Sequence, residues 1–238
     1  MLNPLITIVT VVFNDVFGIE NTIKSVLNQT YKKIEYIIID GGSTDGTVEI
    51  INRYCDRISL FISEADNGIY DAMNKGILHS NGSWINFMNS GDFFYSSTVL
   101  DDIFSRGVDF NSNTVVYGYK FSQGKFYFPY SIDVVYSGII MGNHQSMFFN
   151  VNLCGKSFLM YNTFYRIYSD FDLILRICKK FGNNSLVFKN ICVVNYLGGG
   201  ISSKVSFQKR KEKFQIILFE LGVLGLFRAL RFKMNISI

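Results

Sequence analysis

Two aspartates, Asp92 and Asp170, stand in patterns where a carboxylate can do chemistry. Asp92 ends the run Asn89-Ser-Gly-Asp92, directly after an apolar stretch that begins at Trp84. Ligands of open α/β sheets bind beyond the carboxyl ends of the strands, and a carboxylate after a glycine there can hold a metal ion or a diphosphate. Asp170 stands at the start of a predicted helix and supplies a second carboxylate. The sequence therefore predicts two acids on opposite sides of one cleft.

The elements that must position these acids alternate between strand and helix in the first half of the chain. Apolar runs predict strands at 5–13, 34–39, 58–62 and from Trp84, and the first run is typical of a strand buried on both faces of a parallel sheet. Apolar residues at helical spacing predict helices at 19–27, 48–54 and 69–78. Each strand runs into a polar loop with Gly or Asp, so we expect these loops to form one site at the edge of a mostly parallel α/β sheet flanked by helices.

The pattern changes after Asp92. Ser169 is expected to cap a helix with Phe171, Ile174, Leu175 and Cys178 on one face. The other predicted elements are a hairpin at 115–119 with 125–128, a strand at 144–149, an extended apolar stretch at 186–196 and a C-terminal helix from Ser206.

Composition narrows the class of protein. The 238 residues correspond to one large domain or one domain with an appendage, and two prolines argue against a disordered or collagen-like chain. The four cysteines lack metal-ligand spacing, so we predict no structural zinc and take those in apolar runs as small core residues in a reducing cytosol. No signal peptide is evident, and Glu220 and Arg228 interrupt the longest apolar stretch, so we predict a cytoplasmic protein without a transmembrane helix.

Five short motifs occur in order along the chain. They are Thr10-Val-Val-Phe-Asn14, Asp40-Gly-Gly-Ser-Thr-Asp-Gly-Thr47, Glu64-x-Asp-x-Gly-Ile-Tyr-Asp-Ala-Met-Asn-Lys-Gly76, Asn89-Ser-Gly-Asp92 and Ser169-Asp-Phe-Asp172. Together they resemble family 2 glycosyltransferases of the GT-A fold, in particular the branch that assembles bacterial polysaccharides. The resemblance implies a GT-A domain over 1–200, with a nucleotide-binding half at 5–95 and an acceptor half at 96–200. It also implies transfer from a nucleotide-diphosphate sugar, expected to be a UDP-sugar, to a glycan acceptor that is expected to be lipid-linked.

The resemblance assigns several motif residues to the donor nucleotide. The family's aspartate at the position of Asp40 hydrogen-bonds the base, usually uracil, and we favour this role over a turn cap. Asp45 is better interpreted as a helix cap, and Lys75 as a surface lysine rather than a phosphate ligand. The other implied donor contacts are Thr10, Asn14, Gly41, Asp66, Gly68, Asp71, Asn74 and Ser90.

The family carries Asp-x-Asp where this chain has Ser90-Gly91-Asp92, so one acid of a Mg²⁺ or Mn²⁺ site is missing. Because phosphates and water fill most positions around Mg²⁺, Asp92 alone can suffice, with lower affinity. A helix-capping role is the alternative for Asp92. Asp170 corresponds to the family's general base, although the acidic pair is reduced to Ser169-Asp170. Asp172 is expected to pair with Arg176 at i, i+4.

Two further segments leave alternatives open. His144 and Gln145 are similar to a family segment near the donor sugar and the acceptor, but a structural strand histidine fits as well. Gly198 to Gly200 form either a mobile lid over the diphosphate or a plain linker.

The tail at 201–238 combines basic and apolar residues. Over 204–233 it predicts a basic amphipathic helix. Such a helix either lies on a membrane surface, here the inner face of the plasma membrane, or packs on the domain with a solvated basic face. Nucleic-acid binding is disfavoured because the basic patch is short and confined to one end.

Three other functions are alternatives for a chain with this pattern. A sugar nucleotidyltransferase would need a Gly-rich, Arg-bearing loop after the first strand, and a dinucleotide oxidoreductase would need Gly-x-Gly-x-x-Gly there; the sequence has neither. A non-catalytic sugar-nucleotide or glycan-binding module stays open, because acids are missing at positions 90 and 169. The prediction is an inverting glycosyltransferase.

Overall fold

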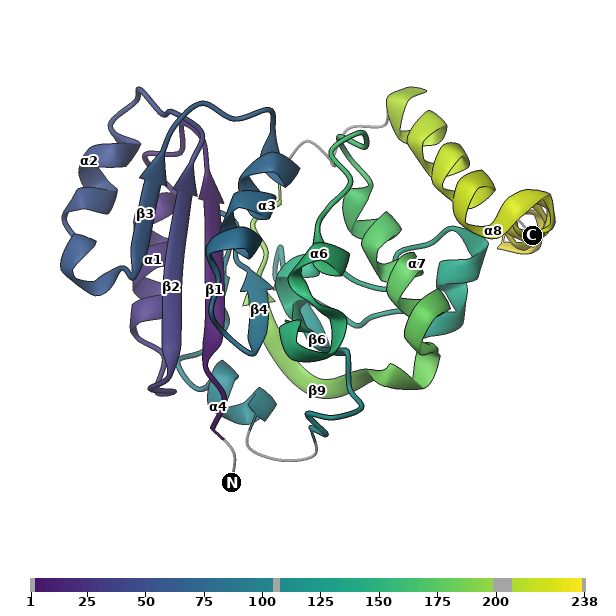
Figure 1. Ribbon diagram of the computed structural model, residues 1–238, viewed down its shortest axis with the longest axis horizontal. Coiled ribbons are helices and arrows are strands. Elements are labelled where there is room, and N and C mark those ends of the chain that lie inside the picture. The colour runs from purple at the N-terminus through teal and green to yellow at the C-terminus, as the bar shows by residue number, and fades with distance from the viewer. Residues whose placement is uncertain (1–2, 105–107, 199–206, 237–238) are drawn as a thin grey trace.

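The computed structural model describes residues 3–104, 108–198 and 207–236. Within them, strands form one sheet in the order β3-β2-β1-β4-β8-β6-β9-β5, with β7 paired to β6 (Figure 1). The strands are β1 (Ile6–Val12), β2 (Ile34–Asp40), β3 (Leu60–Ser63), β4 (Trp84–Phe87), β5 (Phe93–Phe94), β6 (Val115–Ser122), β7 (Lys125–Tyr127), β8 (Met147–Asn150) and β9 (Leu186–Asn195).

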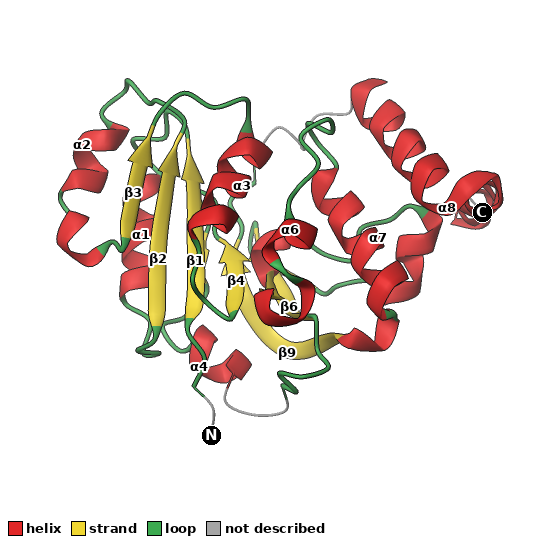
Figure 2. Cartoon of the chain, viewed as in Figure 1, coloured by secondary structure: helices red, strands yellow, loops and turns green. Residues whose placement is uncertain are grey.

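Helices cover both faces of this sheet, as Figure 2 shows in red. The α-helices are α1 (Ile19–Leu27), α2 (Thr47–Asn52), α3 (Ile69–His79), α4 (Val99–Phe104), α5 (Val151–Cys154), α6 (Lys156–Leu159), α7 (Ser169–Phe181) and α8 (Phe207–Ile236). Short 3₁₀ helices are η1 (Cys55–Arg57), η2 (Ile132–Ser137), η3 (His144–Ser146) and η4 (Asn183–Ser185).

Strand β1 explains how the first half is held together. It pairs in parallel with β2 and β4, and all seven of its residues are buried. Val9 and Val11 belong to the core cluster that includes α3, whereas Ile6 and Ile8 belong to the cluster that includes α1. Successive side chains of a strand point to opposite faces, so a continuous apolar run requires a helix on each side. The predicted parallel sheet with both faces covered is confirmed.

The second half continues the same sheet with mixed pairing. β8 runs antiparallel to β4, β6 antiparallel to β8, and β9 parallel to β6. The predicted hairpin β6–β7 is confirmed, and both turn residues, Gln123 and Gly124, have positive φ. The division of the chain at residue 95 into donor and acceptor halves stays a prediction.

Two local predictions were wrong. His144 to Phe149 is not one strand, because His144–Ser146 form a 3₁₀ turn in which Ser146 Oγ donates to the Asn143 carbonyl oxygen at 2.8 Å. Such side-chain-to-backbone bonds compete with strand pairing. Ser169 does not cap α7 either. Tyr168 is the N-cap and Ser169 is the first helical residue, while Glu212 receives the backbone N–H groups just before the helix.

The C-terminal helix α8 consists of two helical segments joined at Gly222, where φ is 68°. It contacts α7 and η2, and its residues Ile216 and Ile217 are buried (Figure 1). The predicted helical tail is therefore confirmed from Phe207 onward, and residues 204–206 lie outside the described part. No helix among the described residues is long and apolar enough to cross a bilayer.

Candidate functional site

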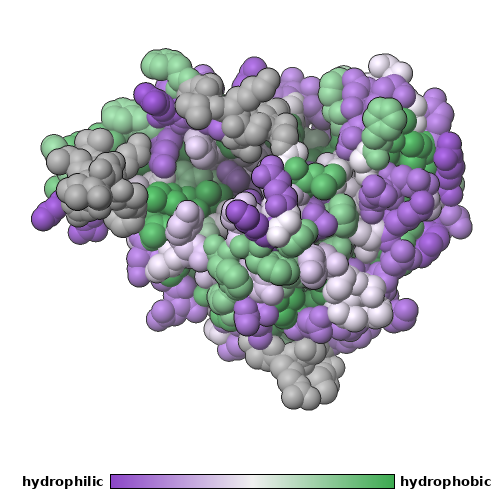
Figure 3. All heavy atoms as spheres, turned by 180° about the vertical axis from the view of Figure 1, so that it is seen from behind, coloured by the Kyte–Doolittle hydropathy of each residue, from purple (hydrophilic) through white to green (hydrophobic). Residues whose placement is uncertain are grey.

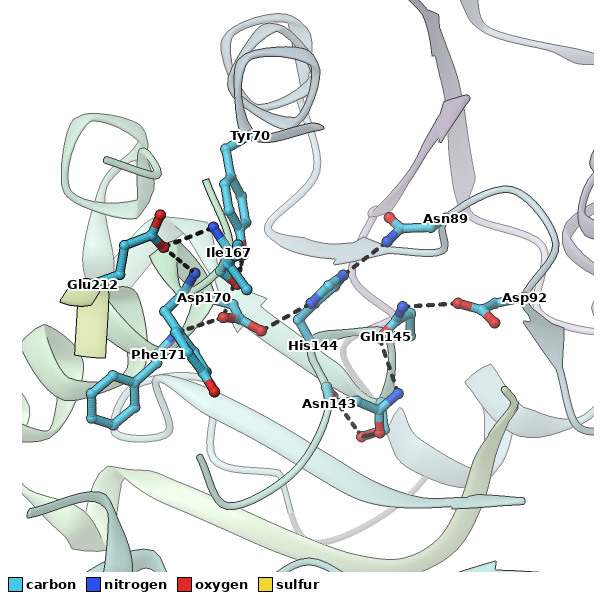
Figure 4. Close-up of polar contacts among 12 residues, drawn as sticks. Tyr70, Asn89, Asp92, Asn143, His144, Gln145, Ile167, Asp170, Phe171 and Glu212 are labelled. Carbon is cyan, nitrogen blue, oxygen red and sulfur yellow. Dashed lines mark hydrogen bonds and ion pairs between the residues drawn. The ribbon is translucent and has the colours of Figure 1, made fainter. Parts of the chain in front are cut away.

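A cavity of about 310 Å³ opens at the carboxyl ends of β1 and β4. Its other walls come from η3, the segment before α7, the start of α7 and the end of β9. These are the strand ends at which ligands of open α/β sheets bind. Five predicted site residues line this cavity: Ser90, Asp92, His144, Gln145 and Asp170. Figure 4 shows how most of them lie.

Asp92 is almost completely buried in the cavity wall, with 6% of its surface exposed. Its Oδ1 accepts from the Leu197 backbone N–H at 3.0 Å, and its Oδ2 accepts from Gln145 Nε2 at 2.8 Å. Burial raises the pKa of Asp92 to about 6, although these two hydrogen bonds oppose the rise. The carboxylate is thus anionic at neutral pH, and each oxygen retains a lone pair. The helix-capping alternative is wrong, because strand β5 follows directly.

His144 connects Asp170 to the turn after β4 (Figure 4). Its Nε2 lies 3.0 Å from Asn89 Nδ2, and its Nδ1 lies 3.4 Å from Asp170 Oδ2. A carboxylate can only accept, so Nδ1 carries the proton toward Asp170. Asp170 Oδ1 accepts from the Phe171 backbone N–H at 2.8 Å and lies 3.4 Å from Tyr70 Oη. The carboxylate is fixed from three sides and still borders the cavity.

Glu212 of α8 holds the segment that leads into Asp170. It is 1% exposed, and its carboxylate accepts from the backbone N–H groups of Arg166, Ile167 and Tyr168 at 2.9 to 3.1 Å. A carboxylate is well suited to unpaired N–H groups at the start of a helix. The tail is therefore part of the site's framework, which the sequence did not predict.

Replacing Glu212 with alanine should destabilise the fold and impair the site together. Three partly buried backbone donors would lose their acceptor, and a buried donor left unsatisfied costs about 1–3 kcal/mol. We expect the free energy of unfolding, measured by denaturant titration, to fall by roughly 3 kcal/mol or more. Glu49→Ala, at an exposed glutamate on α2, is the matched control. Equal stability of the two variants would contradict the role given to Glu212.

Asp40 is fully buried and shapes the loop after β2. Its Oδ2 accepts from Gly42 N, Ser43 N and Ser63 Oγ at 3.1, 2.9 and 2.7 Å, and its Oδ1 accepts from Ser43 Oγ. A contact between Asp40 and a base stays a prediction. Asp45 lies just before the N-cap of α2, and its Oδ1 accepts from the Thr47 backbone N–H at 3.1 Å.

Eight predicted donor contacts do not line the cavity, and three of them, Thr10, Asp71 and Asn74, are held in other contacts. Thr10 is buried, with Oγ1 3.0 Å from Tyr36 Oη. Asn74 bonds the backbone of Tyr161 through both ends of its amide, at 2.9 and 2.8 Å. Asp71 Oδ2 accepts from the Asn67 backbone N–H at 3.0 Å. Each of these two side chains holds backbone in this structure, and a shared ligand for Asp71 and Asn74 stays a prediction.

The remaining predicted residues lie in loops that meet around Gly41. A Cβ at Gly41 would come within 2.6 Å of Asp66 Oδ2 and 3.3 Å of the Phe13 ring. The glycine thus leaves room for Asp66, whose Oδ1 accepts from the Gly68 backbone N–H at 2.8 Å. Asn14 ties the loop after β1 to the loop after β2, because its Oδ1 accepts from the Thr44 backbone N–H at 2.8 Å.

Oxygen atoms suited to a divalent cation gather near Asp92. Asn89 Oδ1 is buried without a hydrogen-bond partner among the described residues, and Asn89 lines the cavity. Ser90, at the position of the missing acid, donates to Asp15 Oδ2 at 2.6 Å and so holds another carboxylate at the cavity wall. The described residues hold no cluster of three or more His, Cys, Asp or Glu that could bind a metal. This oxygen set fits a Mg²⁺ or Mn²⁺ ion that takes most of its ligands from phosphates and water.

Several polar and charged cavity residues were not predicted, among them Asp15, Asn89, Arg166 and Tyr196. Asp15 and Asn89 adjoin predicted motif residues, so their position after a strand was an available signal. Arg166 and Tyr196 come from the segment before α7 and the end of β9, and only the tertiary fold brings them to the cavity. Gly198 also lines the cavity. Residues 199 and 200 lie outside the described part, so the lid stays a prediction.

A sheet that changes from parallel to mixed pairing, with its cavity at the strand ends, is the arrangement of the GT-A fold. The fold matches that of S. aureus TarS in complex with UDP, with a TM-score of 0.71 over 95% of this chain and 70% of that chain at 15% identity. It also matches glucosyl-3-phosphoglycerate synthase from Mycobacterium tuberculosis in complex with Mn²⁺, UDP and phosphoglyceric acid, with a TM-score of 0.68 over 92% and 79% at 14% identity. The predicted fold class is confirmed.

Glycosyl transferase family 2 matches residues 7–162, and the chain belongs to this family. An uncharacterized glycosyltransferase of Mycobacterium tuberculosis is 33% identical over 183 residues, 73% of this chain and 68% of that protein. A PGL/p-HBAD biosynthesis glycosyltransferase of Mycobacterium bovis is 26% identical over 215 residues, 86% and 82% of the two chains. The chain is thus a glycosyltransferase, as its motifs predicted.

Proposed function

We propose that this glycosyltransferase transfers a sugar from a UDP-sugar to a glycan hydroxyl with inversion at the anomeric carbon. The observation that carries the proposal is the 3₁₀ turn η3, whose consecutive residues reach the two acids. His144 lies 3.4 Å from Asp170 and Gln145 lies 2.8 Å from Asp92. Both acids therefore border one cavity, as a donor clamp and a general base require. The UDP complexes of proteins with the same fold support the donor class.

In this proposal Asp170 receives the proton of the acceptor hydroxyl. The acceptor oxygen forms a bond to the anomeric carbon while the bond from that carbon to the β-phosphate oxygen breaks, and UDP leaves. The proton ends on Asp170 and passes to solvent. The His144 Nδ1–H and the Phe171 backbone N–H orient the carboxylate for this role. Attack from the face opposite the diphosphate gives inversion.

Asp92 and Asn89 Oδ1 would hold a Mg²⁺ or Mn²⁺ ion in this proposal. When bound, the ion would compensate the negative charge that develops on the leaving diphosphate. Asp92 is anionic above pH 6, and Asn89 Oδ1 lacks a partner among the described residues, so both oxygens are ready for a hard cation. The Mn²⁺ in the complex of glucosyl-3-phosphoglycerate synthase supports this choice for the fold.

A donor panel tests the function. The whole chain is incubated with UDP-, GDP- and dTDP-sugars, with and without Mn²⁺, and both thermal stabilisation and nucleotide release are measured. We expect UDP-sugars with Mn²⁺ to stabilise the protein and to release UDP slowly by hydrolysis. Stabilisation by UDP without release from any donor would favour the non-catalytic binding module instead.

We further propose that Asp66, rather than Asp40, reads the base. Asp40 already accepts hydrogen bonds from four donors and is fully buried. Asp66 lies beside the exposed ring of Phe13, which borders the cavity, and its Oδ2 occupies the space that Gly41 leaves. A base stacked on Phe13 would face this carboxylate. Uracil presents an N3–H donor to it, whereas cytosine presents an N3 acceptor.

The Asp66→Ala variant should therefore lose base discrimination. We expect the wild-type protein to bind UDP more tightly than CDP, because a carboxylate attracts the uracil N–H and repels the cytosine nitrogen. In the variant the ratio of the two dissociation constants, measured by calorimetry, should fall by about tenfold. Glu64→Ala is the control, since Glu64 lies in the same loop but pairs with Lys75 at 2.7 Å. An unchanged ratio in Asp66→Ala would refute the assignment.

We propose that α8 brings the protein to a membrane surface, where a lipid-linked acceptor resides. One face of α8 packs on the domain through Glu212, Ile216 and Ile217, but Phe219 and Leu224 are 81% and 79% exposed. On the side of the molecule that α8 occupies, Figure 3 shows hydrophobic residues beside hydrophilic ones. Exposed apolar side chains next to lysines and arginines are typical of helices that lie in the membrane interface.

Substituting alanine for both Phe219 and Leu224 should reduce membrane binding. We expect the wild-type protein to sediment with vesicles of anionic lipid and the double variant to lose most of that binding, because each buried apolar side chain contributes about 1.5–3 kcal/mol. Phe17→Ala removes an aromatic ring that is 93% exposed on another surface and is the control. Equal sedimentation of all three proteins would contradict the proposal.

A further inference from the structure

We propose that a second cavity, on the other side of Asp170, binds the acceptor sugar ring that carries the attacking hydroxyl. This inference rests on the proposed function. The cavity has a volume of about 370 Å³ and is here called the aromatic groove. Its walls come from the β6–β7 hairpin, the segment that follows it and the residues next to η3, and they include Lys120, Tyr127, Phe128 and Tyr130.

The aromatic groove and the donor cavity meet at a common wall. Asn143, Ile167, Asp170 and Tyr196 line both of them. Asp92 and Ser90 line only the donor cavity, so the groove lies on the side of Asp170 away from the predicted diphosphate site. A general base must touch the hydroxyl while that hydroxyl faces the donor carbon. An acceptor in the groove would satisfy both conditions.

The exposed rings of the groove indicate what kind of molecule it takes. Phe128 and Tyr130 are 59% and 67% exposed, although rings of this size usually bury most of their surface. Phe128 is held by Tyr119, whose ring centroid lies 4.5 Å away at an interplanar angle of 34°. A sugar ring has an apolar face of C–H groups that packs on aromatic rings, and its hydroxyls need hydrogen-bonding partners.

Those partners are present at the inner end of the groove. Asn143 and Ser146 line it, and so does Lys120, whose Nζ lies 4.3 Å from the centroid of the Tyr196 ring. Burial lowers the pKa of Lys120, while the charge of Asp92 raises it. Lys120 is the one cationic side chain among the described lining residues, and Asp170 is the acid. This balance suits a neutral, hydroxyl-rich ring better than a second diphosphate.

In the transfer step the ring's hydroxyl oxygen forms the new bond to the donor's anomeric carbon. Its proton goes to Asp170, which borders the groove, and UDP leaves from the donor cavity. The glycan beyond the first ring, or its lipid carrier, would extend past the exposed rings toward solvent.

The test measures binding of methyl glycosides to the whole, UDP-bound protein by saturation-transfer NMR. The probes are methyl glycosides of common hexoses, N-acetylhexosamines and deoxyhexoses. We expect at least one to bind, with saturation reaching its ring C–H protons. In Phe128→Ala and in Tyr130→Ala the dissociation constant of that glycoside should rise about tenfold, because a stacking ring is lost. Phe164→Ala, at a ring that is 69% exposed and lines neither cavity, should leave it unchanged.

The UDP affinity of each variant distinguishes a failure of the groove proposal from a failure of the proposed function. Retained UDP binding with weakened glycoside binding in the two groove variants supports the groove. Retained UDP binding with no glycoside binding by the wild-type protein, or with no effect of either substitution, overturns it. If the wild-type protein does not bind UDP, the proposed function is overturned instead. Thermal unfolding of each variant checks that the substituted protein is still folded.

Discussion

Replacing Asp170 with asparagine is expected to slow sugar transfer by about 10²–10⁴-fold while leaving the dissociation constant of UDP unchanged. Asparagine keeps an acceptor for the Phe171 backbone N–H, which now bonds Asp170 Oδ1 at 2.8 Å. It cannot take the proton of the acceptor hydroxyl. The loss should therefore fall on the chemical step and not on donor binding, and it is measured as kcat of transfer beside a calorimetric titration with UDP.

Asp172→Asn is the informative control for this variant. Asp172 lies two residues further along the same helix, but its Oδ2 accepts from Arg176 Nε at 2.9 Å and it does not line the cavity. This confirms the predicted i, i+4 pair. We expect the control to lose stability, because a buried ion pair is weakened, and to keep its transfer rate per folded molecule. Full activity of Asp170→Asn would assign the base elsewhere.

Replacing Asp92 with alanine should abolish the Mn²⁺-dependent part of UDP binding. Asp92 is the central oxygen ligand proposed for the ion. Its loss should therefore lower the affinity for Mn²⁺ by more than the roughly 10–100-fold that is typical when an outer-shell partner of a metal ligand is removed. Calorimetry with UDP, in Mn²⁺ and in a chelator, measures the difference. Asp56→Ala, at an exposed acid on η1, is the control. An unchanged Mn²⁺ effect in Asp92→Ala would exclude Asp92 as the metal ligand.

The pH dependence of wild-type UDP binding follows from the same residue. Burial raises the pKa of Asp92 from 3.8 to about 6, so the fold favours its protonated form. Its contribution to the free energy of unfolding therefore declines as pH rises from about 4 to 6, and it is constant above that. A cation competes with the proton, so the Mn²⁺-dependent affinity for UDP should decline as pH falls from 7 to 5. A flat profile over this interval would contradict the role of Asp92.

The first half of the fold could be predicted because its signals are local. A continuous β-branched run such as Ile6 to Val12 is stable as a strand only when both faces are covered, and the helix at 69–78 follows from Met73 and Ile77 on one face. Asp92 and Asp170 were found for a related reason. Asp92 follows an apolar strand at the sheet edge where ligands bind, and Asp170 matches the family motif that opens a helix; both line the cavity.

The rest of the site depends on contacts that no local pattern records. Asn74 occurs in a donor motif, yet its amide holds the backbone of Tyr161, 87 residues away. Glu212 lies in a tail that composition describes as a basic amphipathic helix, yet it binds the backbone ahead of Asp170. His144 was expected on a strand, and its actual turn depends on hydrogen bonds between Ser146 and Asn143. In each case a polar side chain forms hydrogen bonds with backbone groups. Sequence spacing cannot show which backbone groups these are.

The most direct test of the two-acid account is a crystal structure of the whole chain with UDP and Mn²⁺, read from the anomalous signal of the metal. We predict one Mn²⁺ peak coordinated by the Asp92 carboxylate and both phosphates, with Asp170 facing the same cavity from the far side of the donor position. The account would be contradicted if UDP were bound in the cavity with Mn²⁺ at other residues. It would also be contradicted if the Asp170 side chain pointed out of the cavity that holds UDP.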